Sequence, residues 1–199
     1  MTLQSDIFYK LHDPKAGEMG VVYSQILPGV KSHSASRSTF IEGMRHVATS
    51  VTIVTTDGPA GRLGATVSAF SAVSADPPTV LVCLRSDSRI CSAVSQNRVF
   101  TVSVLPEHDQ DLARVFAGEF DTSVADRFDG IDVETFSNLA PGIQGASIFA
   151  CTIVQMIVQH THTIVIGNVA QVVIGQHCPL LYHDAGYQRL QCGRDASFV

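Results

Sequence analysis

Hydroxyl side chains alternate with apolar ones in residues 64–78, GATVSAFSAVSADPP. In an extended strand Thr66, Ser68 and Ser74 would share one face with Phe70, because successive side chains point to opposite sides. A face of small and hydroxyl side chains lets a flat ligand approach the backbone, where hydroxyl and N–H groups can bond its carbonyls, ring nitrogens or polyol chain. The same pattern also suits an ordinary edge strand with solvated Ser and Thr, which composition alone favours.

A candidate anion site follows in residues 84–92, LRSDSRICS. Ser86 and Ser88 stand where a predicted strand ends and a predicted helix begins, with Arg85 and Arg89 close by in sequence. Free N–H groups at a helix start, together with arginine, form a binding site for phosphate and other anions. A plain N-cap by Ser or Asp explains the same residues, and the two interpretations are compatible.

Other chemistry is poorly supported by the sequence. His160 and His162 would lie on one face of a strand, but no carboxylate or cysteine accompanies them at metal-ligand spacing, so no metal site is expected. The nucleophile motif GxSxG and the nucleotide motifs GxGxxG and Walker A are absent. The five cysteines are irregularly spaced without a CxxC pair. Together with the lack of a secretory signal or a membrane-length apolar run, they predict reduced thiols in a cytoplasmic protein.

The elements that must position these residues are mostly strands. Apolar and β-branched runs predict strands at 51–56, from 63, at 79–84, 99–105, 146–159 and 162–174, and a short helical turn with a last strand in 179–190. Helices are predicted at 39–50, 88–97 and 107–118. The first has the capping-box spacing of Thr39 and Glu42, and Phe40, Met44 and Val47 fall on one of its faces. Short connections favour an antiparallel barrel over a βαβ sheet.

Composition fits one globular domain. The chain has 199 residues, of which 45% are hydrophobic and 16% charged, with a net charge of −5. This balance supplies a sizeable core and argues against a nucleic-acid-binding surface. We interpret residues 1–38 as an N-terminal extension or linker, and residues 39–199 as the domain.

Taken together, these segments resemble the flavin reductase-like family, whose fold is the FMN-binding split barrel. The resemblance runs in order through residues 39–190. It is carried by FIEGMRHVATSVTIVTT (40–56), GATVSAFSAVSADPPTVLVCL (64–84), SRICSAV (88–94), FTVSVL (100–105), DLARVFAG (111–118), DRFDG (126–130), HTIVIGNV (162–169) and PLLYHDAGYQRL (179–190).

The resemblance implies a mainly β, antiparallel Greek-key split barrel with a few short helices, usually a homodimer, with FMN or FAD in a groove near the dimer interface. The implied flavin-binding residues are Thr66, Val67, Ser68 and Ala69 for the ring and ribityl chain, Arg85, Ser86, Ser88 and Arg89 around the ribityl and phosphate, and also Ser74. His162 matches the family's histidine near flavin and nicotinamide, and Tyr187 matches its C-terminal aromatic residue.

The implied function is reduction of FMN or FAD by NADH or NADPH, with the reduced flavin diffusing to a partner flavin-dependent monooxygenase. The hydride passes between cofactors, so no side-chain nucleophile is required. Two alternatives stay open: a tightly flavin-bound electron-transfer or binding protein of the same fold, and a reductase of cobalamin or ferric complexes. The chain departs from the family in one segment, where His160-Thr161-His162 replaces the frequent Gly-Asp-His, and in having Arg85 where Asn is frequent.

Overall fold

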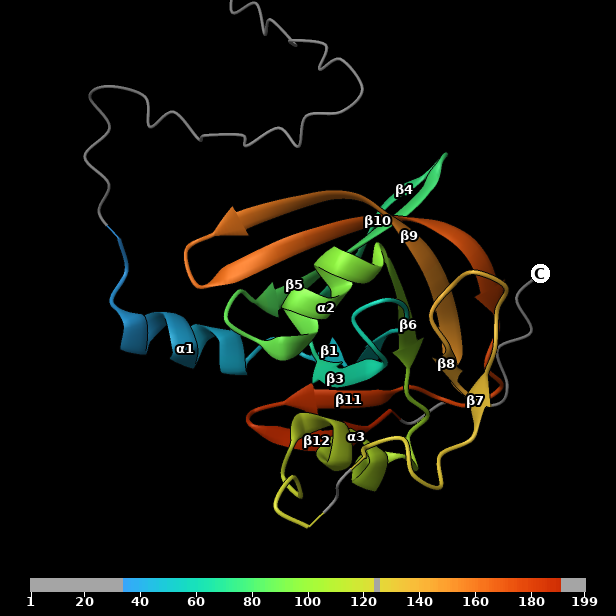
Figure 1. The fold of residues 1–199 in the computed structure, drawn as a ribbon. Helices are drawn as coiled ribbons and strands as arrows, with labels where there is room; N and C mark the ends of the chain where they lie inside the picture. The colour runs from blue at the N-terminus through green and yellow to red at the C-terminus, as the bar shows by residue number, and fades with distance from the viewer. Residues whose placement is uncertain (1–33, 124–125, 191–199) are drawn as a thin grey trace, which may run out of the picture. The chain divides into compact units, whose positions relative to one another are not determined.

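The computed structural model describes residues 34–123 and 126–190 (Figure 1). The predicted extension therefore lies almost entirely outside the described residues. Within them, strands dominate and three helices are present: α1 (Arg37–Arg45), α2 (Arg89–Asn97) and α3 (Gln110–Ala117). This confirms the prediction of a mainly β fold.

The main sheet has seven antiparallel strands. Their spatial order is β3 (Leu63–Val67), β2 (Thr52–Thr56), β6 (Val99–Val104), β9 (Ser147–Gln159), β10 (His162–Val173), β5 (Pro78–Arg85) and β4 (Phe70–Ala75). Smaller sheets are formed by β1 (Thr49–Ser50), β11 (Leu180–His183) and β12 (Gly186–Arg189), and by β7 (Val133–Glu134) with β8 (Gly142–Ile143). Residues 179–190 thus form a hairpin, and the helical turn predicted there is wrong.

The predicted single hydroxyl strand is two strands. The chain leaves β3 at Val67, turns at Ser68 and Ala69, and enters β4 at Phe70. Because β3 and β4 lie at opposite ends of the strand order, this turn joins the two edges of the sheet. The Cys83 amide donates to the Ala69 carbonyl at 3.0 Å, which holds the turn against β5. The sheet therefore curls into a split barrel whose two edges meet at Ser68 and Ala69.

Two apolar cores lie on opposite sides of β2. Val54 belongs to the first core, which packs β5, β6 and β10 beneath α2, with Val94 and Phe100 fully buried. The neighbouring Ile53 belongs to the second core, which joins the sheet to α3 through Phe116 and to β11. Successive side chains of β2 point to opposite sides of the sheet, so this one strand packs against the core beneath α2 on one side and against the core with α3 on the other.

Helix α1 differs from its prediction. It begins at Arg37 with Ser36 as its N-cap, whose hydroxyl accepts from the Thr39 amide at 3.1 Å, so Thr39 is not the cap. No residue of α1 is buried. Its apolar face is exposed, with exposed fractions of 63% for Phe40 and 47% for Met44.

The cysteines also correct an expectation. Cys83, Cys91 and Cys151 are free thiols, and burial raises the pKa of Cys151 to about 12. Cys178, however, takes part in a disulfide bond, so the expectation of reduced thiols is wrong for this residue. None of the described helices is long and apolar enough to cross a membrane.

Asn97, the last residue of α2, fastens the turn between β2 and β3. Its side-chain amide donates to Thr56 Oγ1 at 3.1 Å and to the Gly61 carbonyl at 3.0 Å, and its oxygen accepts from the Ala60 amide at 2.8 Å. These bonds satisfy a buried amide and set the path of the chain into β3.

We predict that Asn97→Ala lowers the free energy of unfolding by about 2–3 kcal/mol, because three hydrogen bonds of a buried amide are lost, one of them to the buried Thr56 hydroxyl. Urea titration of both proteins measures this difference. The control is Gln96→Ala, at an exposed neighbouring position, which is expected to stay within about 0.5 kcal/mol of the parent. Equal effects of the two substitutions would contradict the role given to Asn97.

Candidate functional site

A cavity of about 800 Å³ opens beside β3, at the start of α2. It is walled by β3 and the residue before it, by the end of β5 and the start of α2, by the end of α3, and by the segment that follows. The lining residues are Arg62, Leu63, Gly64, Ala65, Thr66, Arg85, Ser88, Arg89, Ile90, Phe116, Ala117, Asp121, Asp126, Arg127 and Phe128.

The β3 wall is fixed by its contacts with α3. A Cβ placed on Gly64 would lie 2.4 Å from a Phe116 ring carbon, so only glycine allows this ring to pack against the strand. The Thr66 hydroxyl donates to the Ala113 carbonyl of α3 at 2.6 Å. Thr66 therefore ties the wall to α3 with the hydroxyl that the sequence had suggested for a ligand.

Arg127 clamps the segment that closes the cavity. Its guanidinium pairs with Asp121 through two bonds, Nε to Oδ1 at 2.9 Å and Nη2 to Oδ2 at 2.6 Å. Its Nη1 donates to the carbonyls of Gly64 and Phe116 at 3.1 and 2.9 Å. The bonds to Arg127 hold the pKa of the Asp121 carboxyl below its ordinary value. With these four bonds, Arg127 acts as a structural clamp.

The start of α2 is the positive end of the cavity. Ser88 is the N-cap: its hydroxyl accepts from the Cys91 amide at 3.3 Å and donates to the Arg85 carbonyl at 2.6 Å. The amides of Arg89 and Ile90 have no acceptor within the helix. The Arg89 side chain forms no ion pair or hydrogen bond with any described residue, although its charge helps lower the Asp121 pKa. An anion here would meet free N–H groups and an unpaired guanidinium.

A second polar corner lies where β5 ends and β10 begins. Arg85 pairs in register with His162 and binds the Asp87 carboxylate at 3.1 and 2.7 Å. The hydrogen bond from Arg85 lowers the Asp87 pKa, and the charges of Arg85 and His162 act in the same direction. His162 Nδ1 lies 2.9 Å from the Thr161 hydroxyl. Asp87 thus brings an acidic group near His162, where the sequence 160–162 contains none.

The structure brings some of the predicted residues together and separates others. Thr66, Arg85, Ser88 and Arg89 line the cavity. Val67, Ser68 and Ala69 continue from its edge along the β3–β4 turn, with Ser68 and Ala69 exposed. Ser86 bonds Thr163 of β10 at 2.9 Å, next to His162.

Two predicted residues lie elsewhere. The Ser74 hydroxyl bonds the Asp76 amide and carbonyl at 3.1 and 2.9 Å and so stabilises the turn into β5. Tyr187 packs against the second core and against the ring of Tyr182, and burial raises its pKa. Neither residue lines the cavity.

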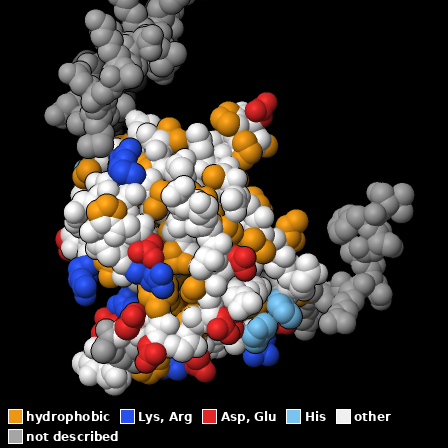
Figure 2. Space-filling model, turned by 45° about the vertical axis from the view of Figure 1, so that its right-hand side comes forward, with side chains coloured by type: hydrophobic (Ala, Val, Ile, Leu, Met, Phe, Trp, Pro, Cys, Tyr) orange, Lys and Arg blue, Asp and Glu red, His pale blue; other side chains and the backbone are white. Residues whose placement is uncertain are grey.

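Sequence reasoning missed Arg62, Phe128 and the Arg127–Asp121 clamp. Arg62 donates to Asp57 at 2.8 Å and lies over the ring of Phe128. Its only sequence signal was its place after the turn residues 57–61. The sequence around DRFDG (126–130) is compatible with a turn or a short helical piece, and nothing in it indicates that the segment lines the cavity with α2. Figure 2 shows basic and acidic side chains intermixed on one face, with hydrophobic ones between them. The described residues contain no cluster able to hold a metal ion.

Comparison with known proteins gives a consistent result. The family model described as flavin reductase like domain matches residues 44–191. The FMN reductase (NADH) RutF of Klebsiella variicola (strain At-22) is 35% identical over 160 residues, which cover 78% of this chain and 95% of that protein.

Solved structures agree. The NADH:FAD oxidoreductase SgcE6 of Streptomyces globisporus C-1027 has a TM-score of 0.72 at 29% identity, covering 79% of this chain and 95% of that one. The styrene monooxygenase flavin reductase SMOB of Pseudomonas putida S12 has a TM-score of 0.68 at 26% identity, covering 77% of this chain and 99% of that one.

The Arg127–Asp121 clamp predicts a pH-dependent stability. Since the folded-state pKa of Asp121 is lowered, the clamp stabilises the protein above the unfolded carboxyl pKa of about 3.9. This contribution is lost as the pH falls through the folded-state value. We expect Asp121→Asn to lower the thermal midpoint at pH 7, and the gap to the parent to narrow as the pH falls below about 4. Asp132→Asn, at an exposed residue without an ion pair, is the control. A gap that stays constant with pH would contradict the clamp.

Proposed function

Because this chain belongs to the flavin reductase-like family, we propose that it catalyses the reduction of FMN or FAD by NADH or NADPH. The observation that carries the proposal is the cavity at the start of α2, whose unpaired Arg89 and free amides suit a flavin phosphate. The cavity opens beside the β3–β4 turn, which offers exposed backbone to a flat ring. The catalytic unit would be the domain from residue 39 onward, and the protein would work in the cytoplasm.

In this proposal the flavin ring lies against residues 66–69, and the ribityl chain runs into the cavity. The small exposed residues Ser68 and Ala69 allow the ring to approach the backbone. N–H groups along this turn would stabilise negative charge on the pyrimidine side of the reduced ring. When both ligands are bound, the nicotinamide supplies a hydride to the flavin, and the protein's contribution is alignment.

His162 would orient the nicotinamide at the corner with Arg85 and Asp87. The imidazole projects from the first residue of β10, and its Nδ1 is held by the hydroxyl of Thr161. Asp87, fixed by two bonds from Arg85, favours a positive charge nearby. Ser86 would contact the ribityl chain through the same corner, whereas Ser74 and Tyr187 serve the turn and the second core.

The reduced flavin would pass to a separate flavin-dependent monooxygenase. The solved relatives include the reductase components of a styrene monooxygenase and of a two-component tryptophan halogenase. In this proposal the separate oxygenase carries out the oxygen chemistry, and this chain supplies the reduced flavin.

We also propose a homodimer built on α1. Its apolar side chains Phe40, Ile41 and Met44, and Val47 beyond its end, are between 40% and 63% exposed. An amphipathic helix whose apolar face is left exposed by the part of the chain that the structure describes suits a contact with a partner. A second copy of the chain offers a partner surface of matching chemistry, since the apolar faces of two α1 helices can cover each other.

The first test is nucleotide oxidation followed at the nicotinamide absorbance band, with and without added FMN or FAD. We expect oxidation that depends on flavin. Absence of flavin-dependent oxidation with both nucleotides would refute the proposal, and reduction only by a partner protein would indicate an electron carrier.

Ser68→Tyr is expected to raise the flavin Kd at least tenfold, because the larger side chain fills the ring site, and to leave the thermal midpoint unchanged. Ser71→Tyr, exposed on β4, is the matched control and is expected to bind flavin normally.

The dimer has its own test. Phe40→Glu combined with Met44→Glu places charge on the apolar face of α1, so we expect light scattering to show a monomer where the parent is a dimer. Arg37→Glu changes charge on the same helix outside this face and is expected to leave the dimer intact. A monomeric parent protein would contradict the proposal.

A further inference from the structure

We propose that the end of the cavity formed by Arg62 and Phe128 is an adenylate subsite, which takes the adenosine 5′-phosphate half of a dinucleotide. The subsite deepens the proposed function and rests on it, because it lies beyond the part of the cavity that a flavin phosphate would fill. The dinucleotide is either FAD itself or the nicotinamide donor, which share this half.

Length along β3 is the first argument. The proposed ring site spans residues 66–69 and so includes Val67, the last residue of β3, whereas Arg62 stands immediately before the first residue of this strand, Leu63. At about 3.3 Å per residue, the Cα atoms of Arg62 and Val67 lie about 16 Å apart. The ribityl phosphate of FMN is one short chain, and with its phosphate at the start of α2 it would leave the Arg62 end of the cavity empty. A dinucleotide continues through a second phosphate to another ring.

Volume points the same way. The cavity measures about 800 Å³, which is in the range that holds an entire drug-sized ligand. Of the ring-site residues 66–69, however, only Thr66 lines it, so the flavin ring would occupy little of this space. A cavity of this size is larger than a single phosphorylated chain requires.

The Arg62 end offers the surfaces on which a purine stacks. The guanidinium carbon of Arg62 lies 5.7 Å from the centroid of the Phe128 ring. One face of the planar guanidinium covers this ring, and the Arg62 side chain remains 46% exposed. Nucleic-acid bases stack on guanidinium planes and aromatic rings in proteins.

The same end is held rigid. Arg62 Nε donates to Asp57 Oδ2 at 2.8 Å, which orients the plane and leaves the terminal nitrogens for a phosphate. Asn97 binds the Gly61 carbonyl just before Arg62. The Phe128 ring meets the edge of Phe116 at a centroid distance of 5.0 Å and an interplanar angle of 83°.

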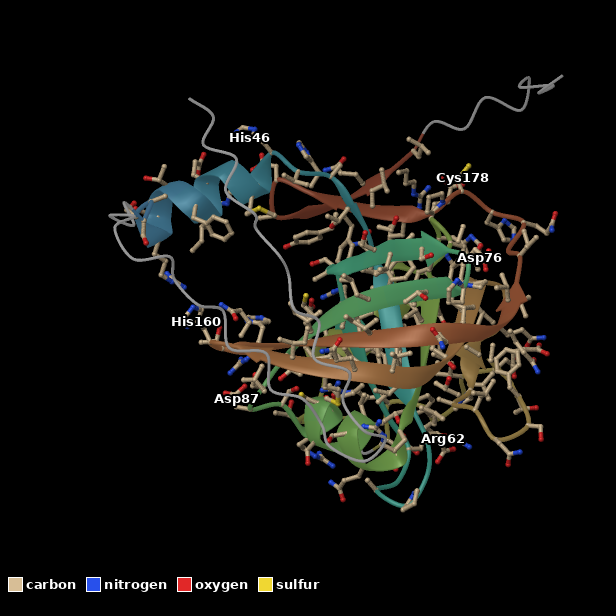
Figure 3. All side chains as sticks on the ribbon, turned by 90° about the horizontal axis from the view of Figure 1, so that it is seen from above. His46, Arg62, Asp76, Asp87, His160 and Cys178 are labelled. Atoms are coloured by element: carbon tan, nitrogen blue, oxygen red, sulfur yellow. The ribbon has the colours of Figure 1, made fainter. Side chains whose placement is uncertain are left out.

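The remaining positive groups stand at the two ends of the cavity. Arg127 is occupied by its four bonds, and Arg85 is paired with Asp87. Donors therefore remain on Arg89 at the start of α2 and on the terminal nitrogens of Arg62. In Figure 3, Asp87, one residue before Ser88, and Arg62 lie on opposite sides of α2. This separation suits a ligand whose phosphates lie between two rings.

The experiment compares FAD with FMN. We expect the parent to bind FAD at least as tightly as FMN, measured by quenching of flavin fluorescence. Arg62→Ala should raise the Kd for FAD about tenfold, as expected for loss of one stacked base, and leave the Kd for FMN within twofold. Arg114→Ala is the matched control, because Arg114 also pairs with a carboxylate and covers a phenylalanine, Phe120, outside the cavity.

A second arm identifies the source of the adenylate. The KM for NADH is measured with FMN, which has no adenylate, as acceptor. An increase in this KM with Arg62→Ala, without a change in FAD affinity, assigns the subsite to the nicotinamide donor. An increase in the FAD Kd alone assigns it to the flavin.

The proposal is overturned if Arg62→Ala changes neither quantity, or if it weakens FMN and FAD equally. Calorimetry with ADP separates this proposal from the proposed function. ADP binding that Arg62→Ala weakens would support the subsite even in a protein that reduces no flavin. If the protein reduces flavin but Arg62→Ala has no effect in any assay, the proposed function stands and the adenylate subsite is refuted.

Discussion

The fold and the site both depend on the backbone turn at Ser68 and Ala69. This turn carries the chain from β3 at one edge of the seven-stranded sheet to β4 at the other. The bond from the Cys83 amide to the Ala69 carbonyl ties this turn to β5, the neighbour of β4. The turn therefore links the two edges of the sheet, and its small residues Ser68 and Ala69 are exposed. The same small residues leave exposed backbone at the mouth of the cavity, where a flat ring can lie.

Positive charge in the cavity is divided between structural and ligand-binding duties. Arg127 donates hydrogen bonds to Asp121 and to two backbone carbonyls, and these bonds fix the segment that closes the cavity. Arg89 has no protein partner among the described residues and stands beside the free amides at the start of α2. Four arginines therefore do not make a uniformly basic pocket. The arrangement suits one ligand phosphate at a defined position and limits nonspecific attraction of anions.

Sequence reasoning was sufficient where local signals agree. The β-branched runs at 51–56 and 162–174, and the Ser88 cap before an apolar helical period, predicted strands and a helix that the structure contains. It failed where tertiary context decides. The alternation at 64–75 continues through Ser68 and Ala69, so no local signal shows that the chain changes edges there. Likewise, the apolar period of α1 was correctly identified, but the period could not reveal that no other described segment buries this face.

The site was predictable in part for the same reason. Ser88 and Arg89 carry a local signal, because cap and cation adjoin in sequence. Arg62 and Phe128 come from distant segments, and their contact depends on how Asn97 and Phe116 position them. Asp87 shows the converse case, since a carboxylate missing from the 160–162 segment is supplied from the end of a neighbouring strand. The sequence of residues 160–162 alone cannot show that a carboxylate from another segment lies near His162.

The central claim, that flavin lies on the Ser68–Ala69 turn with its phosphate at the start of α2, is tested most directly by a crystal structure of the protein with FAD. The account predicts the ring in contact with the backbone of this turn, and the ribityl phosphate within about 3 Å of the Ile90 amide or the Arg89 guanidinium. Flavin bound elsewhere, with the cavity beside β3 left to solvent, would contradict it.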